Sequence, residues 1–207
     1  IDDQNISAYL PTEIAFDKYD NAWIAYQSEN ELYADSDISY SPGGLRVLDY
    51  NDINNENDDI WYNYPFSELL GINVWSIDIG KDQYNNDILW VLSDLGVMGY
   101  LISIDNSFTL LDIELVPINP YFYFTNLPFE QGCKIRVDNQ NNAWISTKND
   151  GIKVIKSNGL LWPDNYGLLQ ENSKLLSNKI NDIVFDDYGF VYVATDKGIS
   201  IFEIPFL

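Results

Sequence analysis

The sequence predicts an all-β protein, a β-propeller of antiparallel four-stranded blades, with about four blades in its 207 residues. Three observations lead to this prediction. One phrase occurs four times: an alternating apolar run, a turn rich in Asp, Asn and Gly, and then an aromatic and a branched aliphatic residue. The copies follow one another at similar intervals. No stretch of about 12 residues has the i, i+3, i+4, i+7 apolar stripe of an amphipathic helix.

The four copies of the phrase are EIAFDKYDNAWI (13–24), SIDIGKDQYNNDILWV (76–91), KIRVDNQNNAWI (134–145) and DIVFDDYGFVYV (182–193). Aligned on the aromatic residue after the turn, they place Trp23, Trp90, Trp144 and Tyr192 at one position. The intervals between these aromatics are near the length of a four-stranded propeller blade, about 40–50 residues. Aromatic residues that recur in this way are expected to pack between blades rather than to contact a ligand.

Each unit contains the same order of expected strands. The first strand alternates apolar and polar residues, and the Asp/Asn/Gly turn closes a hairpin onto the second strand. The second strands are AWIAY, LWVLS, AWIST and VYVAT. A glycine turn leads to the third strand, and glycine allows the positive φ of such a turn. These glycines are Gly44, Gly96, Gly151 and Gly198. Outer strands are expected at 59–64, 107–115 and 159–162, and a polar insertion at 27–42.

The blade units are expected at 11–66, 72–116, 131–163 and 178–207, as one propeller domain or part of one. The fourth unit has three strands, and ISAYL (6–10) is a candidate for the missing outer strand. With that strand the units would close a four-bladed ring. Without it the chain is an arc of a larger propeller, with exposed sheet faces that favour association. A β-sandwich is the alternative fold, but it does not explain the repeated phrase.

Composition restricts the partners and the chemistry. Eleven Lys and Arg against 32 Asp and Glu give a net charge of −21, which argues against nucleic acid and anionic membranes as partners. The sequence has no run of about 18 apolar residues, so membrane insertion of this segment is not expected. The absence of His excludes Ser-His-Asp and Cys-His catalysis and His-based zinc sites. Cys133 is the single cysteine and is expected to be a buried structural thiol.

The phrases DNQNNAWISTKNDGIKVI (138–155) and FDDYGFVYVATDKGISIF (185–202) resemble the two-component regulator propeller repeat. That repeat occurs in extracytoplasmic sensor regions of hybrid histidine kinases, mainly in Bacteroidetes-like bacteria, and in propellers linked to type IX secretion. Units three and four match it best. The resemblance implies a propeller in an extracytoplasmic location, periplasmic, secreted or at the cell surface. It concerns blade geometry and transfers no catalytic residue.

Acidic residues supply two further hypotheses. The turns at 17–21, 138–142 and 186–189 are rich in oxygen ligands suited to calcium, although Asp and Asn also close turns by themselves. None matches a calcium loop with a distal Glu, so no cofactor is expected and calcium is kept as an alternative. Carboxylate pairs for glycoside hydrolysis, such as Asp58 with Asp59 or Asp186 with Asp187, require a cleft that sequence does not reveal.

Aromatic residues outside the repeated phrase are the candidates for ligand binding. They lie in WYNYPF (61–66), NPYFYFTNLPF (119–129) and LLWPDNY (160–166). Outer strands and loops packed on their own blade would explain them structurally. Alternatively they form an aromatic surface that stacks on a sugar ring or on a protein partner, because loops on a rigid scaffold concentrate binding residues. The candidate ligand-binding residues are Trp61, Tyr121, Tyr123 and Trp162.

The sequence therefore predicts a non-enzymatic, extracytoplasmic recognition module, a ligand-sensing or protein-docking propeller of a bacterial signalling or surface system. An oligosaccharide or a protein is the expected partner, and self-association through blade edges is a further expectation. Two alternatives remain open. One is a glycan-active enzyme that uses a carboxylate pair at the central channel. The other is a purely structural propeller for surface assembly.

Overall fold

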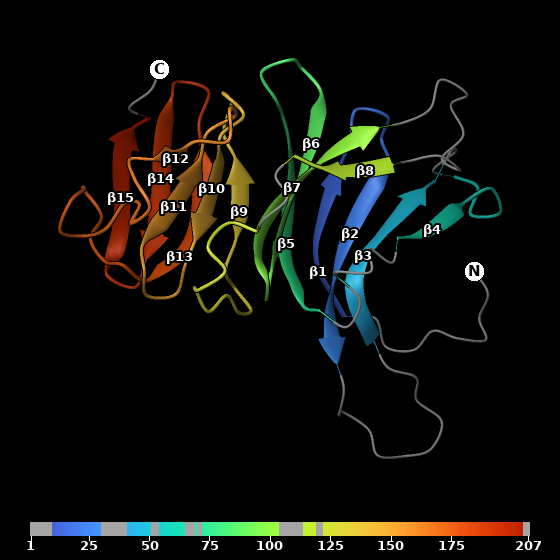
Figure 1. Ribbon diagram of the computed structural model, residues 1–207, viewed down its shortest axis with the longest axis horizontal. Helices are drawn as coiled ribbons and strands as arrows, with labels where there is room; N and C mark the ends of the chain where they lie inside the picture. Colours follow the sequence, from blue (N-terminus) through green and yellow to red (C-terminus); the bar gives the residue numbers. More distant parts are fainter. Residues whose placement is uncertain are drawn as a thin grey trace.

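The computed structural model describes residues 10–29, 41–50, 54–64, 69, 72–103, 114–118 and 122–204. All regular secondary structure in these ranges is β, in four antiparallel sheets, as predicted. The sheets lie side by side in chain order and each packs face to face on the next (Figure 1). We call them blades 1 to 4. The described part of the chain holds no helix long and apolar enough to cross a bilayer.

Blade 1 consists of β1 (Leu10–Phe16), β2 (Ala22–Glu29), β3 (Ser41–Asp49) and β4 (Ile60–Tyr64). Blade 2 consists of β5 (Val74–Lys81), β6 (Asp87–Ser93), β7 (Gly96–Ser103) and β8 (Glu114–Pro117). In both blades the spatial order of the strands is their order in the chain. Each blade is therefore a simple meander, as the repeated hairpin turns predict.

Blade 3 consists of β9 (Ile135–Val137), β10 (Ala143–Ser146), β11 (Ile152–Ile155) and β12 (Leu161–Trp162). Blade 4 has three strands, β13 (Ile180–Phe185), β14 (Phe190–Thr195) and β15 (Gly198–Glu203). The proposed closing strand at 6–10 is described only at Leu10, which begins β1 in blade 1. Residues 6–9 lie outside the described residues.

The 27–42 segment differs from the predicted insertion at both of its ends. Ser28 pairs with Pro42 and Glu29 pairs with Ser41, so β2 and β3 extend further than expected. The segment between them, 30–40, lies outside the described residues. The outer strand expected at 107–115 is observed as β8, from Glu114, and residues 107–113 are not described.

The core lies between the blades. Trp23, Trp90 and Trp144 are each fully buried, and each packs against strands of the following blade. Their predicted role in packing between blades is confirmed. Tyr192, the fourth member of the set, is only partly buried, because none of the described sheets packs on the corresponding face of blade 4. Cys133 is buried in the core between blades 2 and 3, as expected.

At two of the turn positions only glycine fits, because another segment of the chain approaches the backbone closely. Gly96 has φ 118°, and a Cβ there would lie 2.4 Å from the carbonyl oxygen of Tyr123. Gly151 has φ 69°, and its Cβ would lie 2.0 Å from the carbonyl oxygen of Leu168. Side chains larger than hydrogen would therefore displace the loops that follow blades 2 and 3. The positive φ predicted for the four turn glycines is confirmed.

Candidate functional site

The acidic turn of each repeat is a structural unit. In blade 1, one carboxylate oxygen of Asp17 accepts hydrogen bonds from the backbone N–H groups of Tyr19 and Asn21, at 2.9 and 3.0 Å. The other accepts from Asn21 Nδ2 and from Trp23 Nε1. Blade 3 repeats this pattern around Asp138 and Trp144. The carboxylate thus both closes the turn and fixes the indole that packs on the next blade.

Blade 2 departs from this pattern. The first strands β1 and β5 each contain a β-bulge near their start. Between the bulge and the turn, six residues of β5 (Ser76 to Lys81) pair with β6, whereas four residues of β1 pair with β2. The longer hairpin places its turn carboxylate, Asp82, eight residues before Trp90 instead of six. Asp82 accepts hydrogen bonds only from Tyr84 and Asn86. Trp90 Nε1 is buried and has no hydrogen-bond partner among the described residues.

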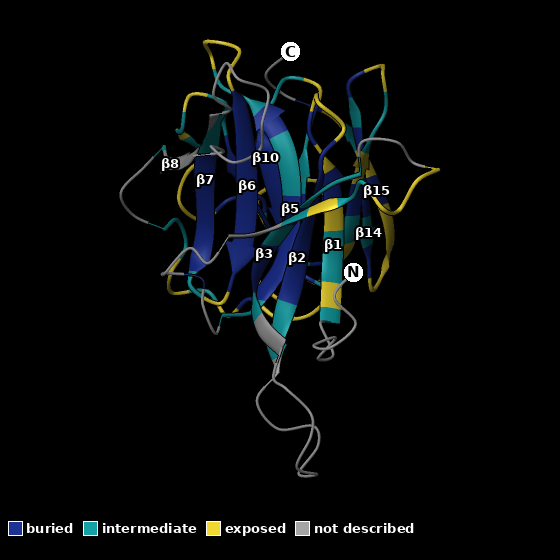
Figure 2. Cartoon of the chain, turned by 90° about the vertical axis from the view of Figure 1, so that its right-hand side faces the viewer, coloured by how far each residue is buried: buried dark blue, intermediate teal, exposed yellow. Residues whose placement is uncertain are grey.

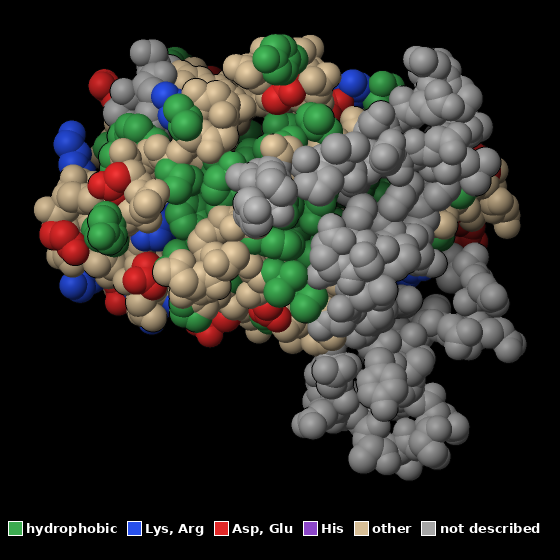
Figure 3. Space-filling model, in the orientation of Figure 1, with side chains coloured by type: hydrophobic (Ala, Val, Ile, Leu, Met, Phe, Trp, Pro, Cys, Tyr) green, Lys and Arg blue, Asp and Glu red, His purple; other side chains and the backbone are tan. Residues whose placement is uncertain are grey.

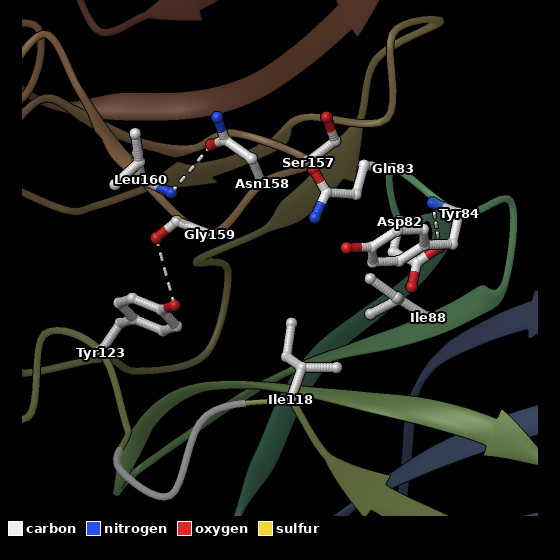
Figure 4. Close-up of a pocket in the computed structure, with 10 residues that line it drawn as sticks. All are labelled: Asp82, Gln83, Tyr84, Ile88, Ile118, Tyr123, Ser157, Asn158, Gly159 and Leu160. Atoms are coloured by element: carbon white, nitrogen blue, oxygen red, sulfur yellow. Dashed lines mark hydrogen bonds between the residues drawn. The ribbon is translucent and has the colours of Figure 1, made fainter.

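The lengthened hairpin forms one side of a pocket between blades 2 and 3 (Figure 4). Its volume is about 290 Å³. The opposite side is the turn between β11 and β12, and the base includes Ile88 and Ile118. Figure 4 shows Gln83 pointing across the pocket toward Ser157, with Tyr84 and Asp82 on one side and Tyr123 on the other. The lining residues are Asp82, Gln83, Tyr84, Ile88, Ile118, Tyr123, Ser157, Asn158, Gly159 and Leu160.

Backbone pairing fixes Tyr123 in this pocket. Its N–H donates to the carbonyl of Val97 and its carbonyl accepts from Val97 N–H, at 2.8 and 2.9 Å. Its hydroxyl donates to the carbonyl of Gly159 at 3.2 Å. Tyr123 therefore connects the outer part of blade 2 to the β11–β12 turn of blade 3. The ring is held in place before any ligand arrives.

Two large apolar side chains at the pocket are exposed to solvent. Tyr84 is 76% exposed and Leu160 is 63% exposed. Side-chain amides of Gln83 and Asn158 lie beside them. Burial raises the pKa of Asp82, but hydrogen bonds from Asn86 and Tyr84 outweigh this effect and leave the pKa below its ordinary value. The pocket combines apolar rings with polar groups that donate and accept hydrogen bonds.

A second polar cluster joins the first strands of three blades. Glu13 Oε2 in β1 accepts hydrogen bonds from Ser76 Oγ of β5, from Lys134 Nζ just before β9 and from Arg136 Nη1 of β9, at 3.1, 2.6 and 3.2 Å. Arg136 also approaches Asp182 of β13, at 3.9 Å. Burial raises the pKa of Glu13, but the two cations more than compensate, and its pKa lies below the ordinary value. The cluster is an ion-pair network that connects blades 1 and 3.

Asp78 is a partly buried carboxylate in the same region. Its two oxygens accept hydrogen bonds from the backbone N–H groups of Ile79 and Val137, at 2.8 and 2.7 Å. Burial raises the pKa of Asp78 despite these hydrogen bonds. The second of them crosses from blade 2 to blade 3. Asp78 therefore contributes to blade packing through its hydrogen bonds.

Calcium was an alternative for the acidic turns. At Asp17 and Asp138 both carboxylate oxygens already accept hydrogen bonds from their own turns. Within the ranges that the structure covers, no three carboxylate or thiol side chains come together to hold a metal ion. The contacts at these turns are those of hairpin closure.

The predicted ligand-binding residues occupy different places. Tyr123 lines the pocket between blades 2 and 3. Trp162 packs near Trp144, with ring centroids 6.4 Å apart, and lines a separate cavity between blades 3 and 4. Trp61 packs on the small apolar cluster of blade 1, and the Arg46 guanidinium lies 5.0 Å from its ring centroid. Tyr121 lies outside the described residues. The three described aromatics do not line one pocket, and their binding role stays a prediction.

Tyr84, the more exposed of the two large apolar side chains at the pocket, was missed by the sequence reasoning, as were Gln83 and Asn158. One signal could have found Tyr84 and Gln83. The interval from the turn Asp to the packing aromatic is six residues in blades 1, 3 and 4, but eight between Asp82 and Trp90. Such a departure from a repeat indicates a hairpin with a function of its own. Asn158 has no comparable signal, because tertiary packing alone brings its turn to the hairpin.

No protein-family model matches the sequence, and no curated protein sequence matches it significantly. Similar solved structures exist. PorZ, a surface component of the type IX secretion system of Porphyromonas gingivalis, has a TM-score of 0.66 and 17% identity, over 93% of this chain and 26% of PorZ. The extracellular domain of the hybrid two-component system protein BT3049 of B. thetaiotaomicron has a TM-score of 0.55 and 17% identity, over 91% of this chain and 21% of that domain.

A gluconolactonase of Xanthomonas campestris also has a TM-score of 0.55, with 12% identity, over 94% of this chain and 57% of the enzyme. With four meander sheets that pack face to face in chain order, these likenesses decide the architecture. The chain has a β-propeller fold. The propeller spans about a quarter of PorZ and about a fifth of the BT3049 domain. These two bacterial proteins are of the kinds that the repeat resemblance named.

Proposed function

We propose that this propeller is an extracytoplasmic recognition module and that the pocket between blades 2 and 3 binds a neutral oligosaccharide. The observation that carries the proposal is the lengthened β5–β6 hairpin, which presents Tyr84 across the pocket from the fixed ring of Tyr123. A sugar offers an apolar ring face for stacking and hydroxyl groups for hydrogen bonds. The amides of Gln83 and Asn158 suit such hydroxyl groups.

Charge and size agree with a neutral ligand. The chain carries a net charge of −21, which disfavours anionic ligands by long-range repulsion. The pocket volume of about 290 Å³ lies near the lower end of the range for small-molecule sites, about 300–1,000 Å³. One terminal sugar residue is therefore a more suitable occupant than a long chain. The extracellular location and the surface role of the two bacterial neighbours support an extracytoplasmic role here.

The enzyme alternative has less support. Glu13 and Asp78, on the first strands of blades 1 and 2, hold the blades together through Lys134, Arg136 and backbone N–H groups. The carboxylate of Asp186 accepts hydrogen bonds from its own turn and from the hydroxyl of Tyr192. A glycosidase would need two carboxyl groups that face a substrate, about 5–10 Å apart. The pocket contains one carboxylate, Asp82, and it is held by its turn.

The proposal is tested by titration calorimetry with neutral gluco- and manno-oligosaccharides, with uronate oligosaccharides as the anionic comparison. We expect binding of a neutral probe, and we expect Tyr84→Ala to weaken it about fivefold or more, because stacking contributes about 1 kcal/mol or more. Tyr188→Ala is the matched control. Tyr188 occupies the same position in the blade 4 hairpin, where its N–H donates to Asp186, and it is 85% exposed.

Two outcomes would contradict the proposal. One is that none of the neutral probes binds at millimolar concentration. The other is that Tyr84→Ala and Tyr188→Ala bind a neutral probe as tightly as the parent chain does. Preferential binding of the uronate probes would also overturn the neutral assignment.

A further inference from the structure

The turn between β9 and β10, residues 138–142, contacts both walls of the pocket. Its last two residues are the adjacent asparagines Asn141 and Asn142. The Oδ1 atom of Asn141 accepts a hydrogen bond from the backbone N–H of Lys81, where the tip of the lengthened hairpin begins, at 2.9 Å. The Oδ1 atom of Asn142 accepts from the backbone N–H of Ser157, a residue of the opposite wall, at 3.2 Å. One turn of blade 3 therefore connects the β5–β6 hairpin with the β11–β12 turn.

This turn is closed by hydrogen bonds of its own. The N–H of Asp138 donates to the carbonyl of Asn142, and the N–H of Asn141 donates to the carbonyl of Asp138, at 3.0 and 2.9 Å. Figure 2 shows that strands such as β6 and β10 are buried, whereas many exposed residues lie in the connections between strands. Asp138 and Asn142 lie in a connection, yet they are only 3% and 2% exposed. Because the turn is closed and partly buried, its two asparagine side chains hold their partners at a fixed separation.

The base of the lengthened hairpin packs directly on blade 3. A Cβ at Gly80 would lie 2.8 Å from Cγ1 of Val137 and 3.7 Å from Oδ1 of Asn141. Two residues before Gly80, the Asp78 carboxylate accepts the N–H of Val137 at 2.7 Å. The end of β5 is thus anchored to the end of β9 and to the turn that follows it. The hairpin tip, which carries Tyr84, extends from this anchored base.

The opposite wall is anchored as well. The β11–β12 turn closes on itself, since the N–H of Lys156 donates to the carbonyl of Leu160 at 2.8 Å. Ser157 ties this turn to the first hairpin of blade 3, and the hydroxyl of Tyr123 donates to the carbonyl of Gly159 at 3.2 Å. Both walls are therefore attached to the same turn of blade 3.

We propose that Asn141 and Asn142 are positioning residues, which fix the separation of the two pocket walls and hold Tyr84 in the geometry that binds a ligand. Their effect on binding rests on the proposed function of the pocket, whereas the anchoring of the walls does not. Walls that are fixed before binding lower the conformational cost of binding. The corresponding residues of the blade 2 turn, Asn85 and Asn86, are exposed, so the residue type alone does not mark this role.

The chain itself supplies suitable substitutions at position 141. Asn141 has φ 64°, and the corresponding residues are Asp20 in blade 1, with φ 65°, and Gly189 in blade 4, with φ 86°. Asn141→Gly therefore removes the side-chain oxygen without straining the backbone. Asn141→Asp keeps an oxygen acceptor at the same position. Asp20→Gly is the matched control, because Asp20 is an exposed turn residue that does not line the pocket.

The first measurement needs no ligand and follows the hydrogen exchange of the Lys81 amide by NMR. In Asn141→Gly this amide loses its acceptor, so its exchange should be about fivefold faster or more. The amide of Tyr84 donates to Asp82 within the hairpin, and its exchange should stay as in the parent. Asn141→Asp and Asp20→Gly should leave the exchange of Lys81 unchanged.

The second measurement is titration calorimetry with the neutral gluco- and manno-oligosaccharides. Asn141→Gly should weaken binding about two- to tenfold, the effect of one lost hydrogen bond. Asn141→Asp and Asp20→Gly should bind as the parent does. Rescue by Asn141→Asp separates the loss of the anchoring oxygen from a general loss of stability, which would not depend on an acceptor at this position.

The outcomes distinguish the positioning role from the proposed function. Unchanged exchange of Lys81 in Asn141→Gly would overturn the anchoring, whether or not an oligosaccharide binds. Faster exchange together with unchanged affinity would overturn the effect of the anchor on binding. If none of the neutral probes binds the parent, the proposed function fails, and the exchange of Lys81 alone decides whether Asn141 anchors the wall.

Discussion

At the residue scale, the turn carboxylate that recurs in the blades makes different hydrogen bonds in blade 3 and in blade 2. Asp138 is buried and holds both its turn and the indole of Trp144. Asp82, at the same turn position, lies in a longer hairpin, holds only the turn, and leaves Trp90 Nε1 without a partner among the described residues. An unpaired buried donor costs about 1–3 kcal/mol. Blade 2 thus exchanges a structural hydrogen bond for a hairpin that reaches the pocket.

Glu13 gives the first prediction at this scale. Its pKa lies below the ordinary value of 4.5, so the ionised carboxylate stabilises the fold at neutral pH. This contribution is lost as the pH falls from about 4.5 through the folded-state pKa. Glu13→Gln should lower the free energy of unfolding by about 1–2 kcal/mol at pH 7. The difference from the parent should shrink toward pH 3, measured by urea unfolding across pH.

Asp78→Asn is the control, and its effect on stability should change with pH in the opposite direction. The pKa of Asp78 is raised by burial, so its contribution is most favourable at low pH and is lost as the pH rises through the folded-state value. Relative to the parent, this variant should gain stability as the pH rises. If the deficit of Glu13→Gln were independent of pH, the ion-pair network would not account for it.

At the element scale, the turns and the loops are coupled. The turn between β6 and β7 carries Gly96, and the next residue, Val97, pairs with the backbone of Tyr123. The turn before β11 carries Gly151, whose neighbour Ile152 pairs with Leu168 in the same way. The third strand of each of these blades therefore holds a loop that belongs to the boundary with the next blade. In blade 2 that loop carries a pocket residue.

Gly96→Ala tests this coupling. A Cβ at this position would lie 2.4 Å from the Tyr123 carbonyl oxygen, in addition to the strain of φ 118°. We expect a loss of about 2–4 kcal/mol in unfolding free energy, together with weaker binding of any oligosaccharide that binds the parent. Gly44→Ala is the matched control, with φ 83° and its nearest contact at 3.4 Å. It should lose about 1 kcal/mol and leave binding unchanged. Equal losses in the two variants would contradict the coupling.

At the scale of the whole molecule, the four described sheets form a row in chain order (Figure 1). On the face shown in Figure 3, acidic and basic side chains are scattered over the part formed by blades 3 and 4, and apolar side chains gather toward the middle. The chain as a whole is strongly acidic.

The same charge should affect stability. Raising NaCl from about 20 mM to about 500 mM shortens the screening length from about 20 Å to about 4 Å. Self-repulsion then weakens, and the melting temperature should rise by about 2–4 °C for each kcal/mol gained. A melting temperature that falls with added NaCl would show that attractive ion pairs dominate.

Much of the architecture followed from the sequence alone. The repeated phrase predicted the sheets, their hairpins, the positive φ of the turn glycines and the burial of Trp23, Trp90 and Trp144. Local pattern determines these features, because alternation, turn chemistry and a recurring aromatic each act within a few residues. The same reasoning placed Tyr123 among the candidate binding residues, but it did not find Tyr84 or Asn158.

Tertiary structure alone decided which residues meet. The pocket joins a hairpin at 82–84 to a turn at 157–160, and Glu13 pairs with cations more than 120 residues away. Such contacts depend on how one blade sits against another, which no short-range pattern records. The exposure of Ile14 and Ile201 is also invisible in the sequence, since both occupy the same pattern positions as residues that are buried in other blades. Whether a neighbouring sheet covers each face determines the difference.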